Sequence, residues 1–97
     1  MAAYIILLQW TDQGIRNVKD TTQRAAAATE AGAKMGVKLT DLFWTLGHYD
    51  LVIVAEAPDD ETITAYNVKL GALGNVKSQT LRAFRSKEME AILKKAA

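Results

Sequence analysis

The sequence predicts an α+β domain of the ferredoxin-like plan, with the element order β-α-β-β-α-β and a helix added at the C-terminus. Three observations support this prediction. Residues 4–10 are apolar at nearly every position and rich in β-branched and aromatic side chains. Residues 21–34 form an alanine-rich stretch, which is typical of a helix. Two further strand-like runs, 37–46 and 49–57, are separated only by Gly47-His48.

The run 4–10 has no polar alternation, which favours a central strand covered on both faces. Thr11-Asp12-Gln13-Gly14 ends this strand, and a helical turn or ordered loop follows over 15–19. Asp20 is then placed as the N-cap of the helix 21–34, with Gln23 completing a capping box. In the ferredoxin-like plan, the helices cover only one face of the antiparallel sheet.

Gly47-His48 fits a two-residue hairpin turn of type II′, in which the first position needs a positive φ. This turn fixes a register in which opposed residues share a face. One face is almost wholly apolar and contains the pairs Leu46–Tyr49, Trp44–Leu51 and Leu42–Ile53, with Ala55. The other face is half apolar and half acidic: Leu39, Asp41, Phe43 and Thr45 lie against Asp50, Val52, Val54 and Glu56.

The second half of the chain continues the pattern. Asp59 or Asp60 caps a helix that runs to about Leu73, before Gly74-Asn75. Residues 76–84 form a strand with more polar groups, which suits an edge of the sheet. Ser86 caps a last helix over 87–95, which has acidic residues early and lysines late.

Composition limits the function. A chain of 97 residues predicts a single domain over 1–97, and 49% hydrophobic with 24% charged residues is typical of globular proteins. A net charge of +1 argues against nucleic acid and membrane partners. The sequence has no cysteine, no apolar run long enough to span a bilayer and no basic segment typical of a signal peptide. We therefore expect a cytoplasmic protein.

The strands carry more apolar surface than the helices can cover. A ferredoxin-like sheet leaves one face without helices, and here that face would present Leu39, Phe43, Val52 and Val54. Such a patch is unusual on a monomer. The predicted partner is a second copy of the chain, in a homodimer or a higher homo-oligomer, because one patch then serves both subunits.

The sequence resembles the GYD domain family of small bacterial proteins. The resemblance rests on Gly47, Tyr49 and Asp50, on Trp10-Thr11-Asp12-Gln13-Gly14, on Glu56-Ala57-Pro58-Asp59-Asp60 and on Gly71-Ala72-Leu73-Gly74-Asn75-Val76. Members resemble the dimeric α/β-barrel superfamily, in which two sheets face each other across a cavity. That superfamily includes haem-degrading monooxygenases, muconolactone isomerases and effector-binding domains, so the resemblance implies a fold and leaves the function open.

We predict a small-molecule-binding module with a cavity at the sheet face and no cofactor. The predicted ligand-binding residues are Trp10, Thr11, Asp12, Tyr49 and Asp50, with Asp50 as polar anchor and Tyr49 as a hydrogen-bonding aromatic. The alternative is a small cofactor-independent enzyme, a monooxygenase or isomerase, with Asp50 as general base. The structural interpretation of Asp50 is a hydrogen-bonded carboxylate that holds the turn, and the lack of an identifiable catalytic partner favours it. A third interpretation of the protein is a structural assembly module with no ligand.

Two other candidates are weaker. His48 is the only histidine and falls in a hairpin turn, so it cannot build a multi-histidine metal site. Asp41 and Glu56 are diagonal neighbours in the predicted register. Two carboxylates supply too few ligands for Mg²⁺ or Ca²⁺, so no metal site is predicted and pairing with Arg82 or Lys77 is the alternative.

Overall fold

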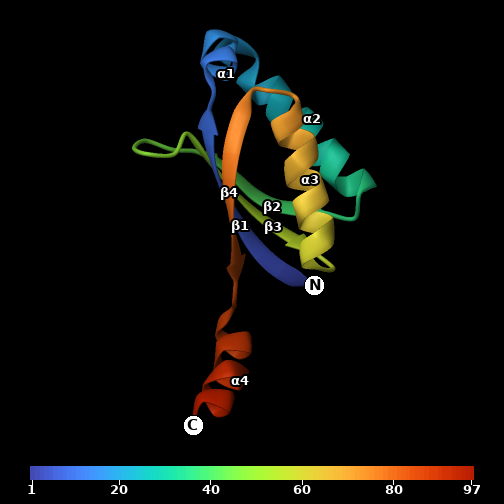
Figure 1. The fold of residues 1–97 in the computed structure, drawn as a ribbon, viewed down its shortest axis with the longest axis vertical. Helices are drawn as coiled ribbons and strands as arrows, with labels where there is room; N and C mark the ends of the chain where they lie inside the picture. Colours follow the sequence, from blue (N-terminus) through green and yellow to red (C-terminus); the bar gives the residue numbers. More distant parts are fainter.

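The computed structural model describes all 97 residues and has the predicted ferredoxin-like fold (Figure 1). Four antiparallel strands form one sheet in the order β2-β3-β1-β4, with β1 inside as predicted and β4 at an edge. No helix has the length and apolar character needed to cross a membrane. The elements are β1 (Ala2–Trp10), α1 (Asp12–Arg16), the 3₁₀ helix η1 (Val18–Asp20), α2 (Thr21–Lys34), β2 (Lys38–Trp44), β3 (Leu51–Ala57), α3 (Asp60–Ala72), β4 (Val76–Ala83) and α4 (Ser86–Ala96).

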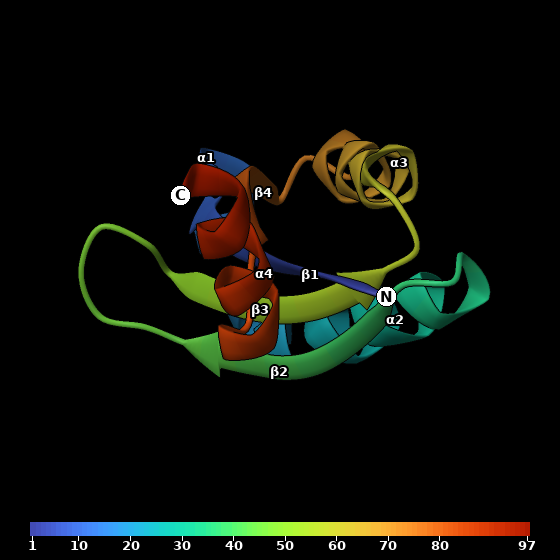
Figure 2. The same cartoon turned by 90° about the horizontal axis from the view of Figure 1, so that it is seen from below.

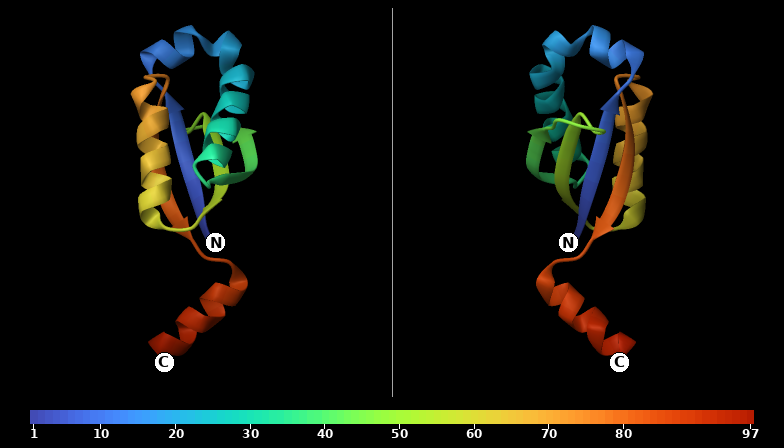
Figure 3. Two further views of the ribbon diagram at one scale, coloured as in Figure 1. Left: turned by 90° about the vertical axis from the view of Figure 1, so that its right-hand side faces the viewer. Right: turned by 90° about the vertical axis from the view of Figure 1, so that its left-hand side faces the viewer.

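Helices α2 and α3 cover one face of the sheet, whereas the opposite face has no helix over it (Figure 3). We call these the helix face and the open face. The core lies on the helix face, where Ile6 of β1 and both Ile63 and Tyr66 of α3 are almost completely buried. The hydroxyl of Tyr66 donates to the carbonyl of Ala28 at 2.8 Å, which ties α3 to α2. Burial raises the pKa of Tyr66 to about 12.

Two local predictions in the first half of the chain are wrong. Asp20 makes no side-chain capping bond, because η1 leads directly into α2. An N-cap residue typically has an extended backbone, whereas the backbone of Asp20 is near-helical (φ −94°, ψ 8°). In β2, a bulge between Leu39 and Asp41 shifts the register. Leu39 therefore pairs with Ala55 and packs against the core, and it does not lie on the open face.

The predicted two-residue turn is a longer loop, Thr45–Asp50, that extends beyond the strands (Figure 2). The predicted pairs Trp44–Leu51 and Leu42–Ile53 are present, and Gly47 has a positive φ of 121°. The loop is closed by the bond from the Thr45 N–H to the Asp50 carbonyl at 2.9 Å. Leu46 is fully exposed and does not pair with Tyr49 in the ladder, because residues 49 and 50 bond to β4 and β1 instead.

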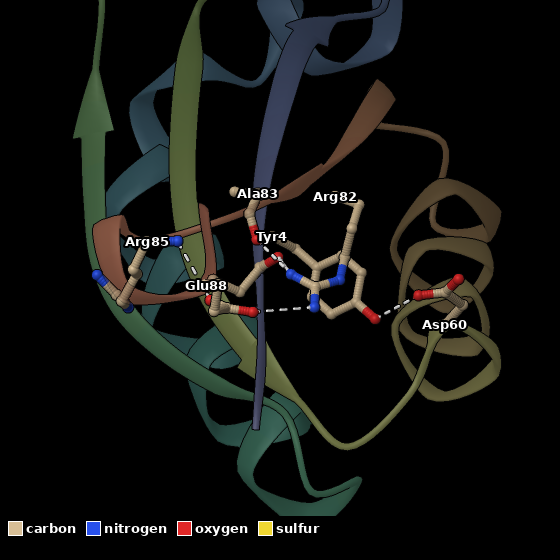
Figure 4. A network of polar contacts seen from close by, with 7 residues as sticks. Tyr4, Asp60, Arg82, Ala83, Arg85 and Glu88 are labelled. Carbon is tan, nitrogen blue, oxygen red and sulfur yellow. Dashed lines mark hydrogen bonds and ion pairs between the residues drawn. The ribbon is translucent and has the colours of Figure 1, made fainter. Parts of the chain in front are cut away.

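Helix α4 extends away from the sheet at the end of β4 (Figure 1). A polar network holds its first turn (Figure 4). Glu88 accepts from the Arg85 N–H at 3.2 Å and pairs with Arg82 at 3.3 Å. The first of these bonds does most to lower the pKa of Glu88. Arg85 is the cap residue, where Ser86 was predicted.

The same network reaches the core through Tyr4. The guanidinium of Arg82 lies 5.6 Å from the Tyr4 ring centre, and the Tyr4 hydroxyl donates to Asp60 at 2.5 Å (Figure 4). The bond to Asp60, together with burial, raises the pKa of Tyr4 to about 12. The tyrosine therefore stays protonated near neutral pH and links the central strand to the start of α3.

Gly14 in α1 is required for a close approach to the start of β4. A Cβ at this position would lie 2.0 Å from the carbonyl oxygen of Asn75. The φ of Gly14 is not positive, so the close approach and not the backbone conformation requires glycine here. Thr11 supports the same junction, since its N–H donates to the Asn75 carbonyl at 3.1 Å.

We expect Gly14→Ala to lower the free energy of unfolding by about 3 kcal/mol, because the added methyl meets backbone that cannot move alone. Gly71→Ala is the matched control, since a Cβ there has nothing within 4 Å and the position is helical. It should raise stability by about 0.5–1 kcal/mol. Urea unfolding measures both, and equal effects of the two substitutions would contradict the close approach.

Candidate functional site

A cavity of about 370 Å³ lies on the helix face, between α2, α3 and the sheet, and is more enclosed than the hollow on the open face. Its floor is formed by strand residues such as Leu8, Leu51 and Ile53, and α3 contributes Leu70, with Leu73 just beyond its end. Of its 16 lining residues, 12 are hydrophobic. A largely apolar cavity of this size, with a few polar groups, is typical of a site for a small molecule.

The alanines of α2 account for the empty volume. Ala25, Ala27, Ala28 and Ala31 all line the cavity. Larger side chains at these positions would fill the space between α2 and α3. The alanine run predicted only a helix from the sequence, and its contribution to a cavity was missed.

Four polar residues line the cavity: Thr21, Arg24, Lys69 and Asn75. Arg24 donates to the carbonyls of Asn17 at 2.5 Å and Gly14 at 3.2 Å. Both Arg24 and Asn75 therefore adjoin α1, which identifies one end of the cavity as its polar end. No pattern in the sequence signals this grouping, because α1, α2 and the start of β4 meet only in the folded chain.

The structure brings only Trp10, of the five predicted ligand-binding residues, to this cavity. Thr11 lies next to it but caps α1, accepting from the Gly14 N–H at 3.1 Å. Its hydroxyl donates in turn to the Gly74 carbonyl. Asp12 is exposed in the first turn of α1. The bonds of Thr11 are thus those of a structural residue.

Tyr49 and Asp50 lie in the loop between β2 and β3 and make contacts across the sheet. The Tyr49 hydroxyl donates to the Gln79 side chain on β4 at 3.1 Å. Asp50 donates its N–H to the Leu8 carbonyl at 2.8 Å and accepts from the Trp10 N–H through its carboxylate at 2.8 Å. Asp50 therefore satisfies the backbone of β1 near the end of the strand. Neither residue lines the cavity.

The other candidates lie elsewhere. His48 is exposed in the same loop, and its carbonyl accepts from the Gln9 side chain at 2.7 Å. Glu56 forms an ion pair with Arg85 at 3.6 Å, so pairing with an arginine is observed, although with a different one from that expected. No group of three or more histidine, cysteine or acidic side chains is placed to hold a metal ion, and Asp41 and Glu56 belong to no such group.

The open face is the second feature of functional interest. Cross-strand pairs place two rows of side chains on it, and Phe43 and Leu81 are 55% and 40% exposed. Apart from Leu39, all the apolar residues predicted for this face are present. The rows are Phe43–Val52–Leu7–Gln79 and Asp41–Val54–Ile5–Leu81.

The environment of Asp50 yields a test of its role. We expect Asp50→Ala to lower the free energy of unfolding by about 1–2 kcal/mol, because the Trp10 N–H loses its acceptor. Asp50→Asn keeps an acceptor oxygen and should cost less. Urea unfolding of both variants measures this difference, and a structural role would be contradicted if Asp50→Ala were as stable as the wild type.

Comparison with known proteins assigns a family. The model of the GYD domain matches residues 4–93. The chain is 32% identical over 95 residues to the "Glutamine synthetase and cystathionine beta-lyase binding protein" of Thermus thermophilus, covering 97% of this chain and all of that protein. The crystal structure of TTHA0845 from the same organism has a similar fold, with a TM-score of 0.59, 24% identity and coverage of 89% and 96% of the two chains. The chain therefore belongs to the GYD domain family.

Proposed function

We propose that this protein is a homo-oligomeric module that binds a small molecule in the cavity on the helix face. The observation that supports this proposal is the cavity itself, which has a volume of about 370 Å³ and a mainly apolar lining. The proposed ligand then lies on the opposite side of the sheet from the expected site between two subunits. Trp10 is the residue that the sequence-based and the structure-based sites share.

Binding fits this cavity better than catalysis. Its lining contains no carboxylate, histidine or tyrosine that could act as a general base. Asp50, the predicted base of the alternative enzyme, is bonded to the Trp10 backbone outside the cavity. The cavity therefore supports binding better than the enzymatic alternative in which Asp50 is the general base.

The oligomer is supported by the surface that one copy leaves uncovered. The accessible surface is 6435 Å², compared with about 5,500 Å² expected for a compact monomer of this mass. The radius of gyration is 14.5 Å, against about 12.5 Å for a compact chain of this length. Covering several hundred Å² of apolar surface at about 25 cal/mol per Å² yields several kcal/mol before association costs.

A second copy of the chain could cover both the open face and the exposed apolar side of α4. The open face is apolar at its centre, and α4 presents Met89 and Leu93, which are 44% and 56% exposed, one helical turn apart. Beside the start of α4, an open hollow is lined by Ile5, Val54 and Phe84 among others. A two-fold dimer allows each copy to supply the same surfaces to the other.

The cavity is tested by filling it. We expect Ala25→Leu to abolish most of the binding of a neutral apolar dye such as Nile red, because the larger side chain occupies the volume. Ala26→Leu is the matched control, since this neighbouring residue is exposed and does not line the cavity. A fluorescence titration with both variants measures binding, and equal affinities would contradict the proposed site.

The oligomer is tested on the open face. Leu81→Lys should weaken a dimer by about 100-fold or more, because a two-fold interface would bury the new charge twice. Val68→Lys is the control, since Val68 is 66% exposed on α3, away from the open face. Sedimentation equilibrium measures the association, and a wild-type protein that stays monomeric at all concentrations would contradict the proposal.

A second candidate role is the recognition of an enzyme. It is favoured by the relative named for binding glutamine synthetase and cystathionine beta-lyase, which aligns with nearly the whole chain. We expect the protein to co-sediment with purified glutamine synthetase in a saturable complex. Sedimentation velocity of the mixture at several ratios measures this, with lysozyme in place of the protein as control; independent sedimentation would exclude that partner.

A further inference from the structure

The cavity combines an apolar body with a cationic polar end. Arg24 on α2 and Lys69 on α3 both line it, and its 16 lining residues include no acidic side chain. The two ion pairs of the structure, Arg82–Glu88 and Arg85–Glu56, involve neither residue. Two positive charges at the lining of an apolar cavity therefore lack a protein counter-ion.

Arg24 is held in place by the protein and keeps donors available. Two of its nitrogens donate to the Asn17 and Gly14 carbonyls, and the guanidinium has five N–H groups in all. These acceptors are neutral carbonyls, so the positive charge is not compensated. The side chain is half-buried, which strengthens its interaction with an anion relative to a fully exposed arginine.

Asn75 adds a neutral donor at the same end. Its side-chain oxygen accepts from Gln13 at 2.9 Å, which directs the amide oxygen toward α1. The backbone of Asn75 packs against Gly14, the residue whose carbonyl also accepts from Arg24. Arg24 and Asn75 thus both contact Gly14 of α1, Arg24 through its guanidinium and Asn75 through its backbone carbonyl.

From this arrangement we infer that the cavity binds an amphipathic monoanion, with a hydrocarbon body against Trp10 and the alanines of α2 and a carboxylate at Arg24 and Lys69. This inference rests on the proposed function and adds the ligand class. The apolar lining excludes a highly charged ligand such as a nucleotide, because most of its charge would lose hydration without a partner. A neutral apolar ligand would leave the two cations uncompensated.

The test uses decanoate and 1-decanol, which share a ten-carbon chain and differ in charge. Isothermal titration calorimetry with the 97-residue protein, below the micellar concentration, should show decanoate binding about tenfold tighter than decanol, as expected for a charge-assisted contact. Decanoate affinity should fall with added salt, whereas decanol affinity should not.

Substitutions locate the charge recognition. Lys69→Gln and Arg24→Gln should each weaken decanoate binding about five- to tenfold more than decanol binding, so that the ratio of the two affinities reports the lost charge. Lys34→Gln removes an exposed lysine of α2 that does not line the cavity, and it should affect neither ligand.

The results separate the ligand class from the proposed function. Equal affinity for decanoate and decanol would overturn the anionic ligand class while the apolar binding site stands. Tighter decanoate binding that ignores both substitutions would also overturn it, because the carboxylate would then be recognised elsewhere. Binding of neither ligand would contradict the proposed function itself.

Discussion

The fold is organised by the burial of β1, a central strand whose two faces are both apolar. On the helix face, Tyr4, Ile6 and Leu8 are almost completely buried under α2 and α3. On the open face, Ile5 and Leu7 are only partly covered. Since alternate residues of a strand point to opposite sides, one layer of helices can bury only half of such a strand. The remaining half is an apolar surface that the helices of one copy do not cover.

The helix face itself is covered incompletely, and this is where the cavity arises. Helix α2 presents alanines to the sheet, so it contributes little side-chain volume above β3 and β1. The core is instead closed by Tyr66, whose hydroxyl reaches the backbone of α2 at Ala28. One large residue thus fixes the spacing of the helices, and the small residues leave the space. Unfilled volume of this kind costs stability, which a bound ligand can restore through its own contacts.

The residues that characterise the GYD resemblance have structural positions that explain their spacing in this chain. Asp50 satisfies the Trp10 backbone, Tyr49 bonds to Gln79 across the sheet, and Gly14 permits contact with Asn75. Together they join the end of β1 to the β2–β3 loop and to the start of β4. This junction lies beside the polar end of the cavity, so the same contacts that stabilise the fold also position Trp10, Arg24 and Asn75.

Local patterns in the chain were sufficient to predict the order of the elements, the central place of β1 and the apolar character of both sheet faces. These features follow from alternation, helix-forming composition and capping residues within a few positions of each other, as at Asp59, whose carboxylate caps α3 at Thr62. Long-range packing set the bulge that turns Leu39 to the core, the open loop at Tyr49, and the presence of Arg24, Lys69 and Asn75 in the lining of one cavity. Each of these depends on contacts between residues far apart in the chain, which no local pattern encodes.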